Sequence, residues 1–156
     1  MKTNWKALIW NIAVPLLVGG LSAILTMGSM QSFALITKPP LSPPSWLFPV
    51  VWSILFVLMG IASYLVYTSN APQDQKSRAL TVYAIQLAVN FFWSIIFFNL
   101  EAYLFAFLWL VLLWALIVLT IILFWQIRRS AGILLLPYLL WVTFAGYLNY
   151  AIYLLN

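Results

Sequence analysis

Residues 103–125 of this chain are YLFAFLWLVLLWALIVLTIILFW, a run without a single charged side chain. A helix needs roughly 20 such residues to cross the ~30 Å hydrocarbon core of a bilayer. Other runs of this kind predict five spans in all, at about 7–27, 46–68, 79–99, 103–125 and 133–155. None alternates polar and apolar residues, which favours helices over barrel strands. The predicted fold class is an all-α membrane protein, with one domain over residues 1–156 built as a five-transmembrane-helix bundle.

The composition of the chain indicates that its solvent is lipid. Hydrophobic residues make up 66% of the sequence and charged residues 6%, with a mean hydropathy of +1.07. A water-soluble domain carries about four times as many charges. The net charge of +5 does not indicate nucleic-acid binding, because the basic residues lie near the ends of the apolar runs, where anionic headgroups account for them. We expect a lipid bilayer as partner and no nucleic acid.

The basic residues also predict the orientation of the chain. Six of the seven fall on one side of the predicted spans: Lys2, Lys6, Lys76, Arg78, Arg128 and Arg129. The other side receives Lys38, with Glu101 in a short turn. Short loops rich in Lys and Arg stay in the cytoplasm. We therefore expect a multi-pass protein of the cell membrane, with a cytoplasmic N-terminus and a C-terminus outside.

The residue types that are missing limit the chemistry of the chain. It has no histidine and no cysteine, so imidazole and thiolate ligands are absent. We expect no metal site and no obligatory cofactor, and a ligand held by packing and neutral hydrogen bonds. No charged residue falls inside an apolar run, which disfavours ion-coupled transport.

The connection between the first two spans, about residues 28–45, differs from the other connections. It contains Lys-Pro-Pro-Leu-Ser-Pro-Pro at residues 38–44, and four prolines in six residues hold the backbone near polyproline II. Two interpretations remain open. The loop is either a shaped lid over a ligand, which would involve Pro43 and Pro44, or a stiff spacer without a binding role.

Uncharged polar and aromatic residues form stripes on three of the predicted helices. The residues that share one face are Gln86, Asn90, Trp93 and Phe97 on the third span, Tyr138, Trp141, Ala145, Leu148 and Asn149 on the fifth, and Trp52, Phe56 and Met59 on the second. At ~1.5 Å per residue, Trp52, Trp93 and Ala145 all fall roughly 20 Å above the cytoplasmic boundary. Convergence at one level predicts an aromatic-walled pocket near the outer face. The alternative interpretation is ordinary core packing, with Gln86 and Asn90 joining neighbouring helices.

These motifs, taken together, resemble the TspO/translocator protein family. Lys38-Pro39, Pro43-Pro44, Trp46, Trp52 and Met59-Gly60 are similar to its first loop and second helix. The resemblance continues through the third helix, with Gln86, Asn90, Trp93 and Phe97-Phe98, and the fifth, with Pro137-Tyr138, Trp141, Phe144-Ala145 and Leu148-Asn149-Tyr150. The matching motifs keep their order and spacing and cover most of the chain.

The resemblance implies a function as well as a fold. Members are five-helix bundles, usually homodimers, that bind tetrapyrroles such as protoporphyrin IX in a pocket closed by the first outer loop. It implies that the ligand-binding residues are Trp52, Asn90, Trp93, Tyr138, Trp141, Ala145 and Leu148, with Pro43 and Pro44 in the lid. Some bacterial relatives promote light-dependent porphyrin breakdown, and the resemblance implicates Trp52 and Trp141 as the catalytic residues of such a reaction.

The end of the chain departs from the vertebrate pattern. Vertebrate members carry a basic residue four positions after the tyrosine that matches Tyr150, and here that position is Leu154. This weakens the expectation of cholesterol binding by that motif, and the missing basic tail favours a bacterial cell membrane over a mitochondrial one. The function we expect is porphyrin binding in a sensing, scavenging or regulatory role. The alternatives are a transporter of tetrapyrroles or other hydrophobic solutes and a light-dependent porphyrin-degrading enzyme.

Overall fold

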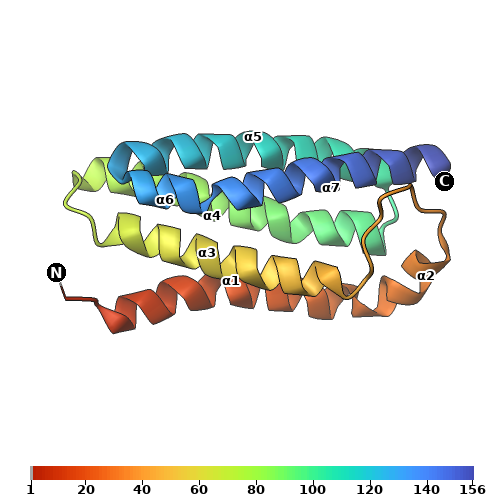
Figure 1. Cartoon of the computed structure of the whole chain (residues 1–156), viewed down its shortest axis with the longest axis horizontal. Helices are drawn as coiled ribbons and strands as arrows, with labels where there is room; N and C mark the ends of the chain where they lie inside the picture. The colour runs from red at the N-terminus through yellow and green to blue at the C-terminus, as the bar shows by residue number, and fades with distance from the viewer. Residues whose placement is uncertain (1) are drawn as a thin grey trace.

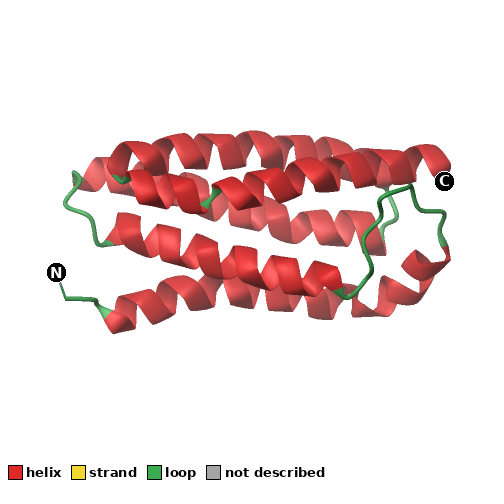
Figure 2. Ribbon diagram, in the orientation of Figure 1, coloured by secondary structure: helices red, strands yellow, loops and turns green. Residues whose placement is uncertain are grey.

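The structure, a computed structural model that describes residues 2–156, is one bundle of long helices (Figures 1 and 2). Within those residues no strand occurs, and five helical segments are long and apolar enough to cross a membrane. The segments are Trp5–Leu35, Leu47–Tyr67, Gln73–Asn99, Tyr103–Ile127 and Arg129–Leu155. The predicted fold class is confirmed.

The helices begin and end at residues that local chemistry explains in part. Helix α1 (Trp5–Thr26) is capped by Asn4, whose side-chain oxygen accepts from the backbone N–H of Ala7 at 3.2 Å. A single turn, η1 (Met27–Ser29), joins α1 to the short α2 (Met30–Leu35). The fifth segment is divided at Leu135 into α6 (Arg129–Leu134) and α7 (Leu136–Leu155), because Pro137 in the first turn of α7 has no N–H to continue the helix.

The remaining helices complete a closed ring. They are α3 (Leu47–Tyr67), α4 (Gln73–Ser94) with its terminal π turn η2 (Ile95–Asn99), and α5 (Tyr103–Ile127). Helix α1 packs on α3 and α4, α5 packs between α4 and α7, and α3 packs on α6. Farther along, aromatic side chains of α3 and α7 contact one another. The fully buried side chains at the centre include Met59, Val66, Leu113, Phe124 and Tyr138.

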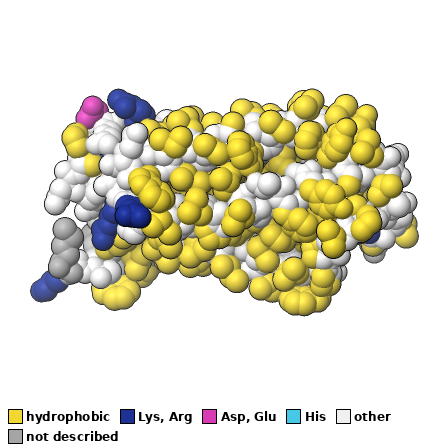
Figure 3. Space-filling view, turned by 45° about the horizontal axis from the view of Figure 1, so that its top comes forward, with side chains coloured by type: hydrophobic (Ala, Val, Ile, Leu, Met, Phe, Trp, Pro, Cys, Tyr) yellow, Lys and Arg dark blue, Asp and Glu magenta, His cyan; other side chains and the backbone are white. Residues whose placement is uncertain are grey.

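The two ends of the bundle differ in charge. The N-terminus and the α3–α4 and α5–α6 connections lie at one end, and the C-terminus lies with the α2–α3 loop at the other (Figure 1). Figure 3 shows Lys and Arg side chains gathered at the first end, while hydrophobic side chains cover the flank. We call the first the basic end and the second, which the distribution of basic residues predicts to face outward, the outer end.

One stretch that the sequence predicts as loop is partly helical. Residues 30–35 form α2 instead of continuing an irregular connection. A six-residue helix is unstable alone, so packing stabilises it: the ring of Phe33 lies 5.9 Å from that of Phe97 and 5.1 Å from that of Phe98. The irregular part of the connection is shorter than expected and begins after Leu35.

Candidate ligand-binding site

Residues 36–46 cross the outer end of the bundle, and their first part is fixed to α2. Nζ of Lys38 donates hydrogen bonds to the carbonyl oxygens of Phe33 and Ala34, at 3.1 and 3.3 Å. Carbonyls in the last turn of a helix lack N–H partners four residues on. The ammonium group therefore caps α2 and complements the negative end of its dipole.

The same loop is tied to α7 at two points. The side-chain amide of Asn156 donates to the carbonyl of Thr37 at 2.8 Å, and its oxygen accepts from the N–H of Thr37 at 3.1 Å. The hydroxyl of Tyr147 donates to the carbonyl of Pro40 at 2.9 Å. Leu41 adopts a φ of 70°, in the left-handed region, where the loop turns. These contacts hold the loop across the end of the bundle.

A cavity of about 520 Å³ lies under this loop. That volume falls in the ~300–1,000 Å³ range of small-molecule pockets. The lining residues are Met30, Phe33, Ala34, Lys38, Ser42, Pro43, Ser45, Phe48, Leu148 and Ile152. Most of the wall is apolar, and Lys38 is its one ionisable residue among the residues described. The cavity can hold an apolar molecule that carries an acidic group.

Two of the nine predicted ligand-binding residues, Pro43 and Leu148, line this cavity, whereas Pro44 follows in the loop and does not. The predicted aromatic residues lie deeper in the bundle, and two of them, Trp52 and Tyr138, contact each other. Trp52 stacks on Phe56 with ring centroids 5.5 Å apart and meets Tyr138 edge-on at 6.2 Å. The second and fifth spans thus converge through their aromatic stripes.

A buried polar network joins α4 to α7 at this level. The side-chain amide of Asn90 donates to the hydroxyl of Tyr138 at 2.7 Å, and that hydroxyl donates to Oε1 of Gln86 at 2.7 Å. All three side chains are buried. Buried polar groups are costly unless paired, so the network fixes the register of the two helices. Asn90 and Gln86 join helices, the alternative role that their sequence pattern allowed.

Trp93 connects the third, fourth and fifth spans near the cavity. Its indole N–H donates to Oδ1 of Asn149 at 3.1 Å, and the amide of Asn149 donates to the carbonyl of Tyr103 at 2.8 Å. The Trp93 ring stacks on Phe97 at 5.1 Å. Phe97 in turn contacts Phe33 of the cavity wall, so Trp93 lies behind the wall and supports it.

Trp141 and Ala145 also lie one layer behind the cavity. The Trp141 ring meets Phe48 edge-on at 5.8 Å, and Phe48 is the wall residue. The indole N–H of Trp141 is buried without a hydrogen-bond partner among the residues described. Ala145 is buried and lies one turn from Leu148 on the same face of α7. The ring of Phe48 therefore separates Trp141 from the cavity.

Several residues of the cavity wall were not predicted from the sequence. Phe48 lies one helical turn from Trp52, and that spacing is the signal that identifies it once α3 is placed. Met30 and Phe33 enter the wall because α2 is helical, and the sequence gives no periodic signal in so short a segment. Within residues 2–156 no cluster of three acidic, histidine or cysteine residues could hold a metal ion.

The sequence of this chain matches a known protein family. The model of the TspO/MBR family matches residues 11–155. The chain is 42% identical over 124 residues to the tryptophan-rich protein TspO of Chlorobaculum tepidum, covering 80% of this chain and 78% of that protein. It is 38% identical to TspO of Archaeoglobus fulgidus over 98% and 99% of the two chains. It is 33% identical to the translocator protein of Bos taurus over 96% and 90%.

Proposed function

This chain belongs to the TspO/MBR family of membrane proteins, and from that premise we propose that it binds porphyrin-like tetrapyrroles under the outer loop. The role is that of a sensor, scavenger or regulator, with protoporphyrin IX as the type of ligand. The observation that carries the proposal is the cavity of about 520 Å³, which has an apolar wall, a tethered loop above it and aromatic rings below it.

Flat aromatic ligands suit the rings around this cavity. Phe33 and Phe48 contribute to its wall, and Trp52, Tyr138 and Trp141 form the layer below. Aromatic rings attract one another in offset or edge-on geometry, beyond the area they bury. A macrocycle that displaces the ring of Phe48 would contact the indoles of Trp52 and Trp141.

The cation at the cavity favours a ligand with a carboxylate. Lys38 is exposed, donates to helix carbonyls and lines the cavity. A carboxylate on the ligand can replace the longest carbonyl contact of Nζ, that to Ile36 at 3.5 Å, with a charge-assisted hydrogen bond. Protoporphyrin IX carries two such groups, and its dimethyl ester carries none.

Binding is tested by titrating purified protein with protoporphyrin IX and following the quenching of tryptophan fluorescence. Ala145→Phe should fill the layer below Leu148 and weaken binding at least tenfold, or ~1.4 kcal/mol. Ala115→Phe makes the same change at an exposed position of α5 and serves as the matched control. Equal affinities in the two folded variants would exclude Ala145 from the site, and no saturable binding by the wild type would refute the proposal.

The dimethyl ester of protoporphyrin IX tests the role of Lys38 separately. Wild-type protein should prefer the free acid to the dimethyl ester, and Lys38→Met should abolish that preference while Lys6→Met, at the basic end, retains it. A preference that survives in Lys38→Met would show that another group receives the carboxylate.

Light-dependent breakdown of the bound porphyrin is a second candidate function. The observation that favours it is the buried indole N–H of Trp141, which has no hydrogen-bond partner within residues 2–156 and lies next to a cavity-wall ring. Illuminated porphyrin activates dioxygen, the oxidant, and an adjacent indole can react with that species or donate an electron to the excited ring. Trp52→Phe and Trp141→Phe should keep much of the binding but lose the protein-dependent decay of the porphyrin's main absorbance band. Decay by wild-type protein no faster than in detergent alone would exclude this function and leave binding intact.

The orientation in the membrane belongs to the same proposal. We place the basic end in the cytoplasm, because short loops with Lys and Arg remain on that side. The ligand cavity then opens near the outer face.

A further inference from the structure

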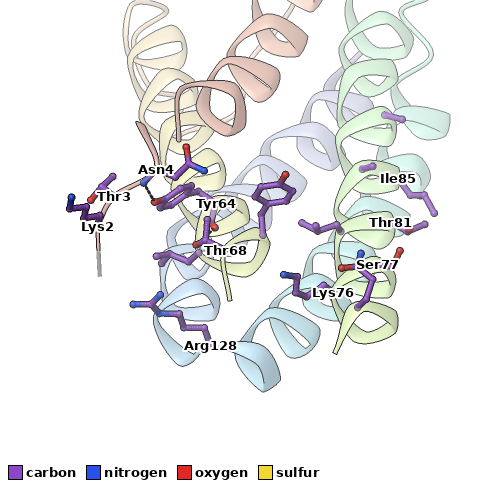
Figure 4. Close-up of a pocket in the computed structure, with 16 residues that line it drawn as sticks. Lys2, Thr3, Asn4, Tyr64, Thr68, Lys76, Ser77, Thr81, Ile85 and Arg128 are labelled. Atoms are coloured by element: carbon purple, nitrogen blue, oxygen red, sulfur yellow. Dashed lines mark hydrogen bonds between the residues drawn. The ribbon is translucent and has the colours of Figure 1, made fainter. Parts of the chain in front are cut away.

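A second cavity lies at the basic end, opposite the ligand cavity. It encloses about 1150 Å³ between the start of the chain, the last turns of α3 and one face of α4 (Figure 4). None of the residues predicted to bind the tetrapyrrole lines it. It extends from the end of the bundle along α4 as far as Ala88.

The mouth of this cleft gathers positive charge from three separate segments. Lys2 precedes α1, Lys76 lies in the first turns of α4, and Arg128 lies between α5 and α6, and all three line the cleft (Figure 4). Nζ of Lys76 donates to the carbonyl of Ser69 at 2.9 Å, which positions the ammonium group and leaves two of its N–H groups for a ligand. Asp74, also in the first turn of α4, is exposed and does not line the cleft.

Neighbouring basic residues do not share this position. The guanidinium of Arg129 lies over the ring of Trp125, 5.6 Å from its centroid, and Arg78 is exposed outside the cleft. The positive charge in the cleft therefore comes from Lys2, Lys76 and Arg128, and not from every basic residue at this end.

The floor of the cleft changes character along α4. Ser77 and Thr81 supply hydroxyl groups near the mouth, and Ala84, Ile85 and Ala88 follow toward the middle of the bundle. From Lys76 to Ala88 the helix rises about 18 Å, close to the ~15 Å of hydrocarbon that one leaflet contributes. A cationic mouth at headgroup depth with an apolar floor of one leaflet's length is complementary to an anionic amphiphile.

We propose that this cleft binds one anionic phospholipid, with its phosphate at Nζ of Lys76 and an acyl chain along Ala84, Ile85 and Ala88. Lys2 and Arg128 lie on the opposite side of the mouth (Figure 4) and attract the headgroup by charge. The hydroxyls of Ser77 and Thr81 also line the cleft and can donate to headgroup oxygens, whereas that of Thr68 already donates to the carbonyl of Tyr64 at 2.9 Å. A free phosphate would use the mouth alone and leave the apolar floor bare. The proposal rests on charge and shape at the basic end and does not depend on tetrapyrrole binding.

The role of the basic side chains is tested by native mass spectrometry, which counts the lipids bound to purified protein in a neutral detergent. Dioleoyl phosphatidylglycerol should bind at least tenfold more tightly than dioleoyl phosphatidylcholine. Lys76→Gln combined with Arg128→Gln should lower that affinity about 25-fold, since each basic group near an anionic headgroup contributes roughly fivefold. Arg78→Gln combined with Arg129→Gln removes the same charge from the same end and should change the affinity less than twofold. An equal loss in both pairs would reduce the effect to general electrostatics and overturn the proposal.

The apolar floor is tested by Ala88→Phe, which narrows the slot at an exposed position. It should weaken phosphatidylglycerol binding at least fivefold, and glycerol 1-phosphate should not compete with the lipid at equal concentration. Effective competition would show a headgroup-only site, and a changed oligomeric state with unchanged lipid binding would show that a second copy occupies this face. Each of those results contradicts the proposal. If the double variant does not fold, Arg128→Gln against Arg129→Gln repeats the comparison with single changes.

Discussion

The close approach of α1 and α3 at Gly60 provides a quantitative test of the packing. A Cβ atom added to Gly60 would lie 2.4 Å from Cα of Ile12 and 2.7 Å from the carbonyl oxygen of Asn11. Both are backbone atoms of α1, so no side-chain rotation can relieve the overlap. Carbon atoms pack at about 3.5 Å or more. In Gly60→Ala, α1 and α3 must therefore separate by about 1 Å.

That separation costs stability in two ways. Overpacking a well-packed interface costs about 1–3 kcal/mol. The hydrogen bond from Oγ of Ser63 to Oδ1 of Asn11, 2.9 Å long, lies at the same crossing, and interhelical bonds of this kind contribute about 0.6 kcal/mol. We expect a loss of about 2–3 kcal/mol, which lowers Tm by about 4–12 °C for a chain of this size.

Thermal unfolding in detergent measures the effect, with Gly20→Ala as the matched control. A Cβ at Gly20 meets nothing within 4 Å, and alanine is favoured over glycine inside a helix by up to ~1 kcal/mol. Gly20→Ala should therefore keep or raise Tm. If Gly60→Ala and Gly20→Ala shift Tm alike, the close approach of α1 and α3 is wrong.

Three further predictions concern the buried network, the orientation and the lid. Tyr138→Phe removes the hydroxyl that satisfies two buried amide side chains and should destabilise the protein by about 1–3 kcal/mol. Tyr153→Phe, at an exposed position, should leave stability unchanged. Equal unfolding curves for the two variants would refute the network. A cysteine at Leu41 should react with a membrane-impermeant reagent in intact cells and one at Ser130 should not, and the reverse pattern would invert the orientation. Asn156→Ala removes the side chain that bonds the outer loop and should speed porphyrin dissociation more than association; unchanged rates in stopped-flow fluorescence would exclude a gating role for the loop.

Much of the fold follows from the sequence because lipid imposes a simple rule on the backbone. In hydrocarbon every N–H and C=O must find a partner within its own segment, so each long apolar run becomes a helix regardless of its neighbours. The run at residues 103–125 is helical in the structure as part of α5. That the side chains of Gln86 and Asn90 face the interior of the bundle was likewise predictable, since an unpaired amide facing lipid is costly.

The partners of those side chains depended on the tertiary structure. A stripe on one helix shows which face turns inward but not which residue of another helix it meets, and only the bundle pairs Asn90 and Gln86 with Tyr138. The stripes predicted pocket-wall residues around Trp52; Leu148 of that set lines the cavity, and the tertiary structure adds Phe48, one helical turn from Trp52, to the wall.

Local pattern and tertiary contact thus determined different parts of this protein. Hydrophobic length and loop charge are properties of continuous segments, so the sequence alone determined the five apolar helices and the gathering of basic residues in particular loops. The helix α2, the approach of α1 to Gly60 and the cleft that joins Lys2, Lys76 and Arg128 arise between segments far apart in the chain. Such contacts depend on how helices cross and on which side chains fill the space between them, and no periodicity within one segment encodes that.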